Sequence, residues 1–310
     1  MSRRMRAIES DGKKFRFVES AWPQRATDSD VVVAVRRVSL NRGELTFGWD
    51  AGVAVGWDAY GIVVETSADG VGPAAGTPVV TWGFSGAWAQ YRLVDHANVA
   101  KVPVGVSDLM ASSLPVAGLT ALRSVRGLGI GSGTSVAVTG ATGGVGHLVV
   151  QLASDVGAEV TAVVRDDDGR QWLEGNGIPP GSIETVAELS GDRTYDAVID
   201  TVGGEVLSAL LPVIKSGGSV LSIGSAGGSD AEVDTDAVIA KGLDVLTYGD
   251  YGVAGADLEL LLDLIADGRL VVHARDVGGW EQIVDGAADS LLARGKVSLS
   301  VGTELSVGTE

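Results

Sequence analysis

The chain has 310 residues, 45% of them apolar, a formal net charge of −17 at pH 7 and no cysteine. This apolar fraction is ample for a packed core, and the sequence has no run of about 18 apolar residues that would predict a membrane-spanning helix. The acidic charge argues against nucleic acid as a partner, because it repels phosphate backbones. The lack of cysteine excludes disulfides, thiolate catalysis and cysteine-based zinc sites.

The first residues have the twin arginine of an export signal but not the apolar core that such a signal needs. Arg3 and Arg4 form a twin arginine, but the charged residues Glu9, Asp11 and Lys13 interrupt the apolar core that should follow. Because a secretory signal needs an apolar stretch at this place, the sequence predicts a cytoplasmic protein.

The N-terminal third predicts a β-rich domain. Short runs of β-branched and aromatic residues alternate with turn residues, which is the pattern of strands joined by turns. The expected strands are Arg6–Glu9, Phe15–Glu19, Val31–Val38, Gly61–Thr66, Pro78–Trp82 and Ala87–Val94. Residues 108–127 then predict a helix, because leucines recur there among small residues.

Residues 135–146 predict a strand, a tight turn and the start of a helix. A β-branched run ends in a glycine cluster, and an apolar helical pattern follows from Leu148. Glycines let the backbone approach a bulky anion, and a helix N-terminus offers N–H groups to a pyrophosphate. The predicted cofactor-binding residues of this turn are Gly140, Thr142, Gly143, Gly144, Val145 and Gly146.

Two more strand–turn units follow the first. Residues 196–204 end in a glycine pair that begins at Gly203, and residues 219–225 end in Gly224 and Ser225. Strands that alternate with helices predict a parallel, doubly wound sheet, in which ligands bind beyond the carboxyl ends of the strands. Gly203, Gly224 and Ser225 are therefore further candidates for cofactor binding.

Arg165 ends the strand predicted over residues 160–164 and bears on the choice of cofactor. An NAD site usually carries Asp or Glu there for the ribose 2′-hydroxyl, whereas arginine suits the 2′-phosphate of NADP. Arg170 is a candidate to assist it. The intervening Asp166–Asp168 either cap the next helix or pair with Arg165 and weaken phosphate binding. We expect NADPH to be the cofactor.

The three histidines, His96, His147 and His273, lie far apart in the sequence. Their spacing does not indicate a metal site, and we predict none. His147 falls in the first turn after the glycine cluster, where we expect a partly exposed helix residue and not a ligand.

The C-terminal part predicts a strand at Leu243–Tyr248, amphipathic helices at Asp257–Ala266 and Trp280–Ala293, and a closing strand at Val297–Val301. The first of these strands is apolar enough to be a buried edge, and an unpaired edge invites aggregation. We therefore expect a homodimer that pairs there. Residues 305–310 repeat the hexapeptide of 299–304, and we assign the second copy no function.

A series of motifs runs in a fixed order along nearly the whole chain. They are Val38-Ser-Leu-Asn41, Gly56-Trp-Asp58-Ala-Tyr-Gly61-Ile-Val63, Gly86-Ala-Trp-Ala89-Gln-Tyr91, Leu119-Thr120-Ala121, the turn at 140–146, the segment 195–204 and Gly295-Lys296-Val297. Together they resemble the medium-chain dehydrogenase/reductase superfamily, in its zinc-free branch of quinone oxidoreductases, zeta-crystallin and enoyl reductases. Any one motif is weak, but their order is specific.

The resemblance implies an α/β fold with a GroES-like β-barrel domain and a Rossmann domain with a doubly wound parallel sheet. The barrel domain would span residues 1–122 and return at 251–310, with the NAD(P)-binding domain at 123–250 and the substrate between them. The resemblance also implies that Asn41 positions the nicotinamide or the substrate carbonyl and that the Thr120 hydroxyl meets the carboxamide. Both would be catalytic and cofactor-binding residues, and Lys296 would belong to the cofactor site.

The sequence departs from the family pattern where the substrate would bind. Zinc-dependent members need Cys and His ligands that this chain lacks. Quinone oxidoreductases often carry a Tyr shortly after the position of Asn41, where this chain reads Gly43-Glu-Leu-Thr-Phe-Gly-Trp49. The segment between Asn41 and Gly56 is also short, which predicts a reshaped pocket. Most of the aromatic residues at 49, 57, 82, 84 and 88 should be in the core, with one or two in this pocket.

We therefore predict an NADPH-dependent oxidoreductase that transfers hydride, without a metal, to a quinone or an α,β-unsaturated carbonyl compound. Without a Lewis acid, ketones and simple alcohols are poor substrates, whereas hydrogen bonds suffice to stabilise the charge on a conjugated acceptor. Two alternatives stay open: a natural-product reductase or cyclase on the same scaffold, and a sensor that binds NADPH without turnover. A short-chain dehydrogenase is excluded, because no Tyr has a Lys four residues on.

Overall fold

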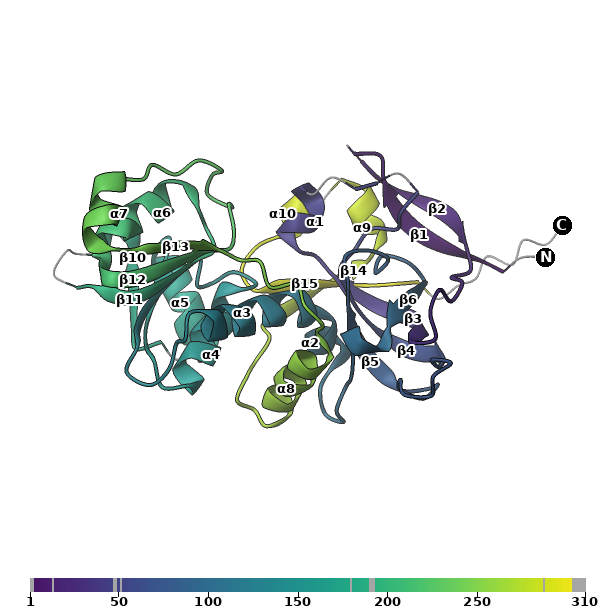
Figure 1. The fold of residues 1–310 in the computed structure, drawn as a ribbon. Helices are drawn as coiled ribbons and strands as arrows, with labels where there is room; N and C mark the ends of the chain where they lie inside the picture. The colour runs from purple at the N-terminus through teal and green to yellow at the C-terminus, as the bar shows by residue number, and fades with distance from the viewer. Residues whose placement is uncertain are drawn as a thin grey trace. The chain divides into compact units, whose positions relative to one another are not determined.

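The structure is a computed structural model that describes residues 3–12, 14–46, 49–50, 52–178, 180–189, 193–286 and 288–302. The chain forms two compact units, and Figure 1 labels most of their elements. The first unit consists of Met1–Leu119 and Gly252–Glu310, and the second is Thr120–Tyr251. Along the chain, the second unit is thus an insertion within the first.

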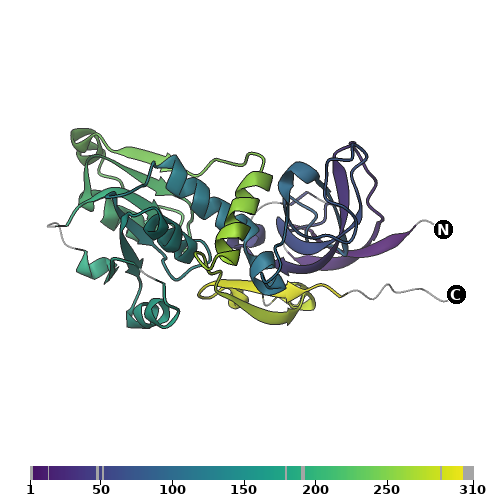
Figure 2. The same cartoon turned by 90° about the horizontal axis from the view of Figure 1, so that it is seen from below.

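The first unit is built on a mostly antiparallel sheet of seven strands. The strands of this unit are β1 (Arg4–Ser10), β2 (Phe15–Ala21), β3 (Asp30–Ser39), β4 (Asp58–Glu65), β5 (Pro78–Trp82), β6 (Tyr91–Asp95), β7 (Val99–Lys101), β14 (Ala274–Gly279) and β15 (Lys296–Ser300). The large sheet has the order β14-β15-β3-β4-β5-β7, with β6 also paired to β3, while β1 and β2 pair separately. Figure 2 shows β14 and β15 side by side, and this pair is parallel.

Short helices connect these strands. They are α1 (Arg42–Thr46), η1 (His96–Asn98), α2 (Asp108–Ser113), α8 (Gly255–Ala266), α9 (Glu281–Val284) and α10 (Ala288–Leu291), and α3 (Pro115–Gly127) continues into the second unit. The helix predicted over 108–127 is thus two helices, because Pro115 has no N–H for the preceding turn and suits the start of a new one. The helix predicted over 280–293 is also divided, and Gly286 lies between its parts with a φ of 78°.

The core of the first unit contains two fully buried tryptophans, Trp88 and Trp280. The ring of Phe15 meets Trp88 edge-on with 5.3 Å between centroids, and Phe17 meets Trp280 in the same way at 5.0 Å. These contacts fix the β1–β2 hairpin against the rest of the unit. In the described part of the chain, no helix has both the length and the apolar composition needed to cross a bilayer.

The second unit is a six-stranded parallel sheet in the order β10-β9-β8-β11-β12-β13. Its elements are β8 (Ser135–Thr139), α4 (Gly146–Asp155), β9 (Glu159–Val164), α5 (Asp167–Gly175), β10 (Ser182–Thr185), η2 (Val186–Glu188), β11 (Tyr195–Asp200), α6 (Gly204–Leu210), η3 (Leu211–Val213), β12 (Ile214–Ser222), α7 (Thr235–Lys241) and β13 (Asp244–Thr247). Figure 1 shows α6 and α7 on one side of this sheet and α4 and α5 on the other. The predicted α/β fold, an antiparallel β-domain with a doubly wound parallel sheet, is confirmed.

Candidate functional site

The glycine turn after β8 is packed so tightly that side chains do not fit at two of its positions. Gly140 has a φ of 57°, and a Cβ there would lie 2.3 Å from the Thr201 Oγ1. A Cβ at Gly146 would lie 2.2 Å from the Gly140 carbonyl oxygen. Gly143 donates its N–H to that same oxygen at 2.7 Å, which closes the turn. The turn therefore has the shape that the sequence predicts for a phosphate-binding loop.

The helix that follows this turn begins without a side-chain cap. Val145 is the N-cap of α4 and makes no side-chain hydrogen bond to the first turn. The residues Thr142, Gly143, Gly144 and Val145 are half-buried, so this end of the helix is open to a ligand. An uncapped N-terminus offers N–H groups and the positive end of the helix dipole, and these fit a pyrophosphate.

A buried carboxylate that the sequence analysis did not single out supports the turn. Asp200, at the end of β11, is fully buried. It accepts the Thr139 hydroxyl at 2.5 Å and the N–H groups of Val202 at 3.1 Å and Gly203 at 2.9 Å. Asp200 thus joins the carboxyl ends of the neighbouring strands β8 and β11. An acidic residue between an apolar strand and a glycine pair is the signal that could have identified it.

The predicted residues after β11 and β12 lie close together. A Cβ at Gly203 would lie 2.8 Å from the Gly224 carbonyl oxygen, and one at Gly224 would lie 2.6 Å from the Thr201 carbonyl oxygen. Ser225, the next residue, is exposed. The three glycine turns therefore follow the adjacent strands β8, β11 and β12 at one edge of the sheet, where doubly wound folds bind ligands.

The two arginines proposed for the 2′-phosphate have different environments. Arg165 follows β9, is exposed, and forms no ion pair with an acidic side chain of the described residues. Arg170 is 2.9 Å from Glu188 and 3.7 Å from Asp167, and also donates to the Ile183 carbonyl. Arg165 is therefore the better placed of the two for a ligand.

The acidic run after Arg165 resolves one of the alternatives left open by the sequence. Asp166 is the N-cap of α5, and its carboxylate accepts the Gly169 N–H at 2.9 Å. Asp167 lies in the first turn of the same helix and is the partner of Arg170. Capping is therefore part of what these residues do, because helix N-termini favour acidic side chains.

His147 corrects an expectation. We expected it to be partly exposed, but it is fully buried in α4. Its Nδ1 lies 2.7 Å from the Gly143 carbonyl oxygen, and its ring meets Trp172 edge-on at 6.1 Å. The helical residues around it are apolar and pack inward, which carries the imidazole into the core with its polar atom on the turn. His147 therefore supports the glycine turn from within the core, through its contact with the Gly143 carbonyl oxygen.

Thr120 lies in α3 and is 8% exposed. Its side chain hydrogen-bonds to the phenol of Tyr248, which also interacts with Arg123 and donates to the Asp250 carbonyl oxygen at 2.8 Å. Burial raises the pKa of Tyr248 and the Asp250 charge adds to the rise, while the Arg123 charge and the hydrogen bonds with Thr120 and Arg123 oppose it. The structure therefore places the Thr120 hydroxyl in a polar cluster of the second unit.

Asn41 lies in the first unit at the start of α1, and every polar atom of its side chain is used. Its Nδ2 donates to Glu44 and to Asp58, both at 3.2 Å, and its Oδ1 accepts from the Lys296 ammonium at 2.6 Å. Two carboxylates on one side and an ammonium on the other fix the orientation of the amide. The predicted residues Asn41 and Lys296 are thus in direct contact, although 255 positions separate them.

The charges around Asn41 are buried. Glu44 and Asp58 are fully buried, Lys296 is 4% exposed and Arg92 is 2% exposed. Burial, and after it the Asp58 carboxylate, raises the pKa of Glu44 to about 8. Burial lowers the pKa of Lys296, against the pull of both carboxylates, and lowers that of Arg92 to about 10. Two acidic and two basic side chains thus lie together in a region with little water.

Two tryptophans lie beside this network and are partly exposed. Trp57 donates its backbone N–H to Glu44 at 2.7 Å, and a Cβ at Gly43 would lie 2.4 Å from its ring. The Trp49 indole donates to the Glu44 carbonyl oxygen at 2.8 Å, and the two indoles are 6.2 Å apart. This bears on the expectation that one or two aromatic residues line a pocket, because Trp49 and Trp57 are only partly buried and both bond to Glu44, the neighbour of Asn41.

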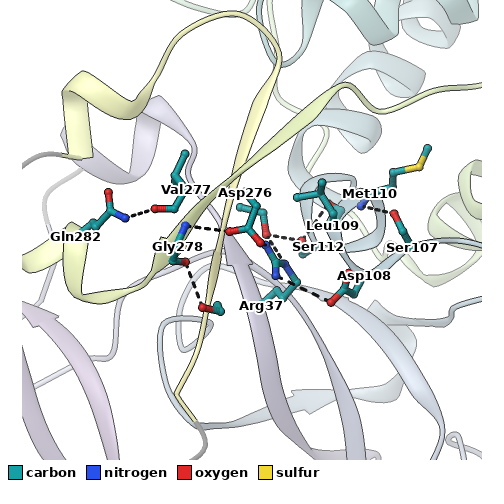
Figure 3. Close-up of polar contacts among 12 residues, drawn as sticks. Arg37, Ser107, Asp108, Leu109, Met110, Ser112, Asp276, Val277, Gly278 and Gln282 are labelled. Carbon is teal, nitrogen blue, oxygen red and sulfur yellow. Dashed lines mark hydrogen bonds and ion pairs between the residues drawn. The ribbon is translucent and has the colours of Figure 1, made fainter.

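A second polar cluster of the first unit holds elements together (Figure 3). Arg37 of β3 forms an ion pair with Asp276 at 2.7 Å and lies 4.0 Å from Asp108. Its Nε donates to the Ser298 hydroxyl at 3.0 Å, and that hydroxyl is 2.8 Å from the Ser112 hydroxyl. The cluster therefore connects β3, α2, β14 and β15, and it explains why an arginine is buried here.

The residues that the structure describes do not gather three His, Cys, Asp or Glu side chains in a way that could hold a metal ion. The two carboxylates nearest Asn41 are already engaged: Glu44 by the Asn41 and Trp57 N–H groups, and Asp58 by Ser39, Asn41 and the Val116 N–H. This set of donors does not fit a catalytic zinc, which takes thiolate, imidazole or free carboxylate ligands.

Comparisons with known proteins found similar sequences among dehydrogenases and reductases. Residues 144–267 match a family model described as zinc-binding dehydrogenase. Over 303 residues, the chain is 29% identical to quinone oxidoreductase-like protein 2 of Bos taurus, and the match covers 90% of this chain and 86% of that protein. It is also 29% identical over 303 residues to a polyketide synthase of Mycobacterium marinum, Pks15/1, of which it spans 14%.

Solved structures share the fold. The quinone oxidoreductase of Coxiella burnetii superposes with a TM-score of 0.82 at 21% identity, over 97% of this chain and 100% of that one. The mycobacterial protein Rv1454c, complexed with NADPH, superposes with a TM-score of 0.83 at 20% identity, over 96% and 99% of the two chains. At these identities the likeness shows the fold.

Proposed function

Because the chain belongs to the medium-chain dehydrogenase/reductase superfamily of oxidoreductases, we propose that it uses NADPH to reduce a quinone or an α,β-unsaturated carbonyl compound without a metal ion. The observation that carries this proposal is the set of groups around Asn41. It consists of an amide, two carboxylates, an ammonium and two partly exposed indoles. The ordered amide can hold the nicotinamide and the indoles can hold a flat, conjugated acceptor, so the set supplies orientation and apolar surface.

The superfamily binds NAD(P), and the second unit has the loops for it. The turn at Gly140 and Gly146 and the uncapped start of α4 would hold the pyrophosphate. The exposed Arg165 guanidinium would bind the 2′-phosphate of NADPH, with Arg170 tied into ion pairs beside it. That Rv1454c is complexed with NADPH supports the same choice of cofactor.

When bound, the cofactor supplies the hydride, and this chain's residues supply orientation. The Asn41 side-chain amide donates to two carboxylates. Its Oδ1 accepts from Lys296 with one lone pair and can accept a second hydrogen bond with the other. Toward a ligand, Asn41 is therefore an acceptor, which favours the nicotinamide carboxamide over a substrate carbonyl as its partner. We propose that the Thr120 hydroxyl of the second unit contributes to cofactor binding, and that Trp49 and Trp57 of the first unit hold the flat face of the acceptor.

A second candidate substrate is an enoyl thioester, the acceptor of a natural-product enoyl reductase. The observation that favours it is the match of 90% of this chain to a segment of a polyketide synthase. The chemistry is the same, because hydride would again reach the β-carbon of a conjugated carbonyl and leave negative charge on oxygen. The two candidates therefore differ in the shape of the acceptor and share the cofactor.

The test is the oxidation of NADPH with 1,4-benzoquinone, a short enone, a crotonyl thioester and a simple aldehyde. We expect the quinone or the enone to be reduced and the aldehyde to be left unchanged. Dialysis against a chelator should not reduce turnover, because no step needs a Lewis acid. Preference for the thioester would support the second candidate. Turnover of the aldehyde alone, or activity that returns only with zinc, would contradict the proposal, and NADPH binding without turnover would indicate a sensor.

A further inference from the structure

We propose that Glu44 is a positioning residue of the acceptor site, which fixes Asn41 and Trp57 through its two carboxyl oxygens and couples turnover to its own proton. The inference rests on the proposed function for the place where the acceptor binds, and it adds a residue and a pH dependence to that function.

The carboxyl group of Glu44 is the point where two separate segments meet. Its Oε2 accepts the backbone N–H of Asn41 at 2.7 Å and the Asn41 Nδ2 at 3.2 Å. Its Oε1 accepts the backbone N–H of Trp57 at 2.7 Å. The backbone carbonyl of the same residue accepts the Trp49 indole at 2.8 Å. One residue therefore bonds to Asn41, Trp49 and Trp57, which we propose to lie around the nicotinamide and the acceptor.

Helix capping alone does not account for this arrangement. Asn41 precedes α1 and Glu44 is the third residue of that helix, so the bond back to the Asn41 N–H is half of a capping box. Capping residues are normally exposed and satisfied by one such bond. Glu44 is instead fully buried, and its second oxygen reaches Trp57, which lies thirteen positions along the chain. The additional bond ties the start of α1 to the segment that leads into β4.

The arrangement needs an ionised carboxylate. Three N–H groups converge on the two oxygens of Glu44, and a carboxylate can accept all of them. A protonated carboxyl has an O–H of its own, which would face one of these donors and break its bond. Protonation would therefore loosen either Asn41 or Trp57.

The surroundings of Glu44 raise the pKa of its carboxyl group into the range around neutral pH. The charged groups that face it are Asp58 of β4, Lys296 of β15 and Arg92 of β6. Burial and Asp58 raise the pKa of Glu44 to about 8, whereas the N–H groups of Trp57 and Asn41 and the Lys296 charge lower it. Glu44 is thus largely protonated below this value and ionised above it. Turnover should rise as the pH passes through about 8.

A raised carboxyl pKa also gives a readout that does not depend on activity. The folded chain holds the Glu44 proton more tightly than the unfolded chain, in which the pKa is the ordinary 4.5. The contribution to stability is therefore complete below 4.5 and is lost as the pH rises through about 8. Glu44→Gln removes the titrating proton and should flatten this part of the stability profile.

The experiment follows kcat with the best acceptor, the affinity for NADPH and the unfolding temperature, each as a function of pH. In the wild type, kcat should rise through about pH 8 while NADPH affinity changes less, because in the proposed function the loops of the second unit supply most of the cofactor contacts. Glu44→Gln has the same length but only one accepting oxygen, so it should lower kcat about tenfold and remove the rise, with a smaller effect on NADPH affinity. Glu44→Asp keeps the charge but is too short to reach both segments, so it should lower kcat and keep a pH dependence.

Glu65→Gln is the matched control. Glu65 ends β4 and accepts the Trp22 indole at 3.1 Å, away from Asn41, so its substitution should leave kcat and its pH profile unchanged. A wild-type kcat that is flat between about pH 7 and 9, or a Glu44→Gln enzyme that keeps the rise, would overturn the inference. If no acceptor is reduced at any pH, the proposed function fails instead, and the two failures are therefore distinguishable.

Discussion

At the scale of single residues, the glycines of the cofactor turn differ in the space they leave. A Cβ at Gly146 would lie 2.2 Å from the Gly140 carbonyl oxygen, whereas one at Gly143 would lie 3.1 Å from the same atom. The first distance requires the backbone to move, and the second requires a shift of a few tenths of an ångström. The sequence motif does not distinguish these glycines, whereas the packing shows that a side chain is tolerated less at Gly146 than at Gly143.

We therefore predict that Gly146→Ala abolishes NADPH binding and that Gly143→Ala weakens it less, because only the first displaces the turn from the helix start. Fluorescence titration with NADPH measures the affinity, and thermal unfolding shows whether the fold persists. Gly175→Ala is the control, because Gly175 ends α5 with nothing within 4 Å of an added Cβ. Equal binding by Gly146→Ala and the wild type would show that the turn is not the phosphate site.

Arg165 decides between the two nicotinamide cofactors in this proposal. Arg165→Asp should weaken NADPH about 10- to 100-fold, which corresponds to one charge-assisted hydrogen bond, and should leave NADH nearly unchanged. Parallel titrations with the two cofactors measure this ratio. Arg16→Asp makes the same change in net charge at an exposed position of β2 and should alter neither affinity. Equal affinity of the wild type for both cofactors would contradict the choice of NADPH.

At the scale of helices and strands, the side chain of one arginine connects four elements of the first unit. The side chain of Arg37 is 10% exposed and links β3 to α2, β14 and β15 through Asp108, Asp276 and Ser298 (Figure 3). Two of these elements escaped the sequence analysis: β14 was not predicted, and α2 was predicted as one helix with α3. Short, polar, glycine-containing segments such as Ala274–Gly279 have weak local patterns, and long-range contacts decide their conformation.

We predict that Arg37→Met lowers the free energy of unfolding by about 1–3 kcal/mol, because it removes the ion pair with Asp276 and the hydrogen bond to the buried Ser298 hydroxyl. Denaturant unfolding measures the change, and the affinity for NADPH should stay the same. Arg36→Met is the control, since Arg36 is the exposed neighbour on the same strand. Similar stabilities of the two variants would mean that the cluster contributes nothing.

At the scale of the whole molecule, the edge strand β13 leaves apolar side chains uncovered. Val245 and Leu246 are 48% and 41% exposed, and β13 is the last strand in the order of the parallel sheet. We expected this strand to be buried, and in the single chain it is not. An apolar edge of this kind is usually covered, and a second copy of the chain that extends the sheet would cover it.

We therefore propose a homodimer that pairs at β13. Light scattering at micromolar concentration should give the mass of two chains, and Val245→Lys should give the mass of one, because a charge on an edge strand opposes pairing. Val104→Lys, at a fully exposed valine of the first unit, should not change the mass. A monomeric wild type would contradict the proposal.

The sequence by itself determined the features of this protein that depend on residues close together in the chain. The alternation of strands and helices, the turn at Gly140 and the order of the motifs predicted the doubly wound sheet, because each depends on local periodicity and on glycine conformations. The family resemblance of the motifs implied Asn41, Thr120 and Lys296 as separate candidates, without a role for Glu44 or Asp200.

Only the tertiary structure decided what surrounds those candidates. The pairing of β15 with β3 brings Lys296 to Asn41, and Glu44 and Asp58 close the other side of the same amide. No local pattern encodes a contact between residues 255 positions apart, because it depends on which strands pair and in which register. The burial that raises the pKa of Glu44 to about 8 has the same origin, since desolvation comes from the packed neighbours and not from the sequence around the residue.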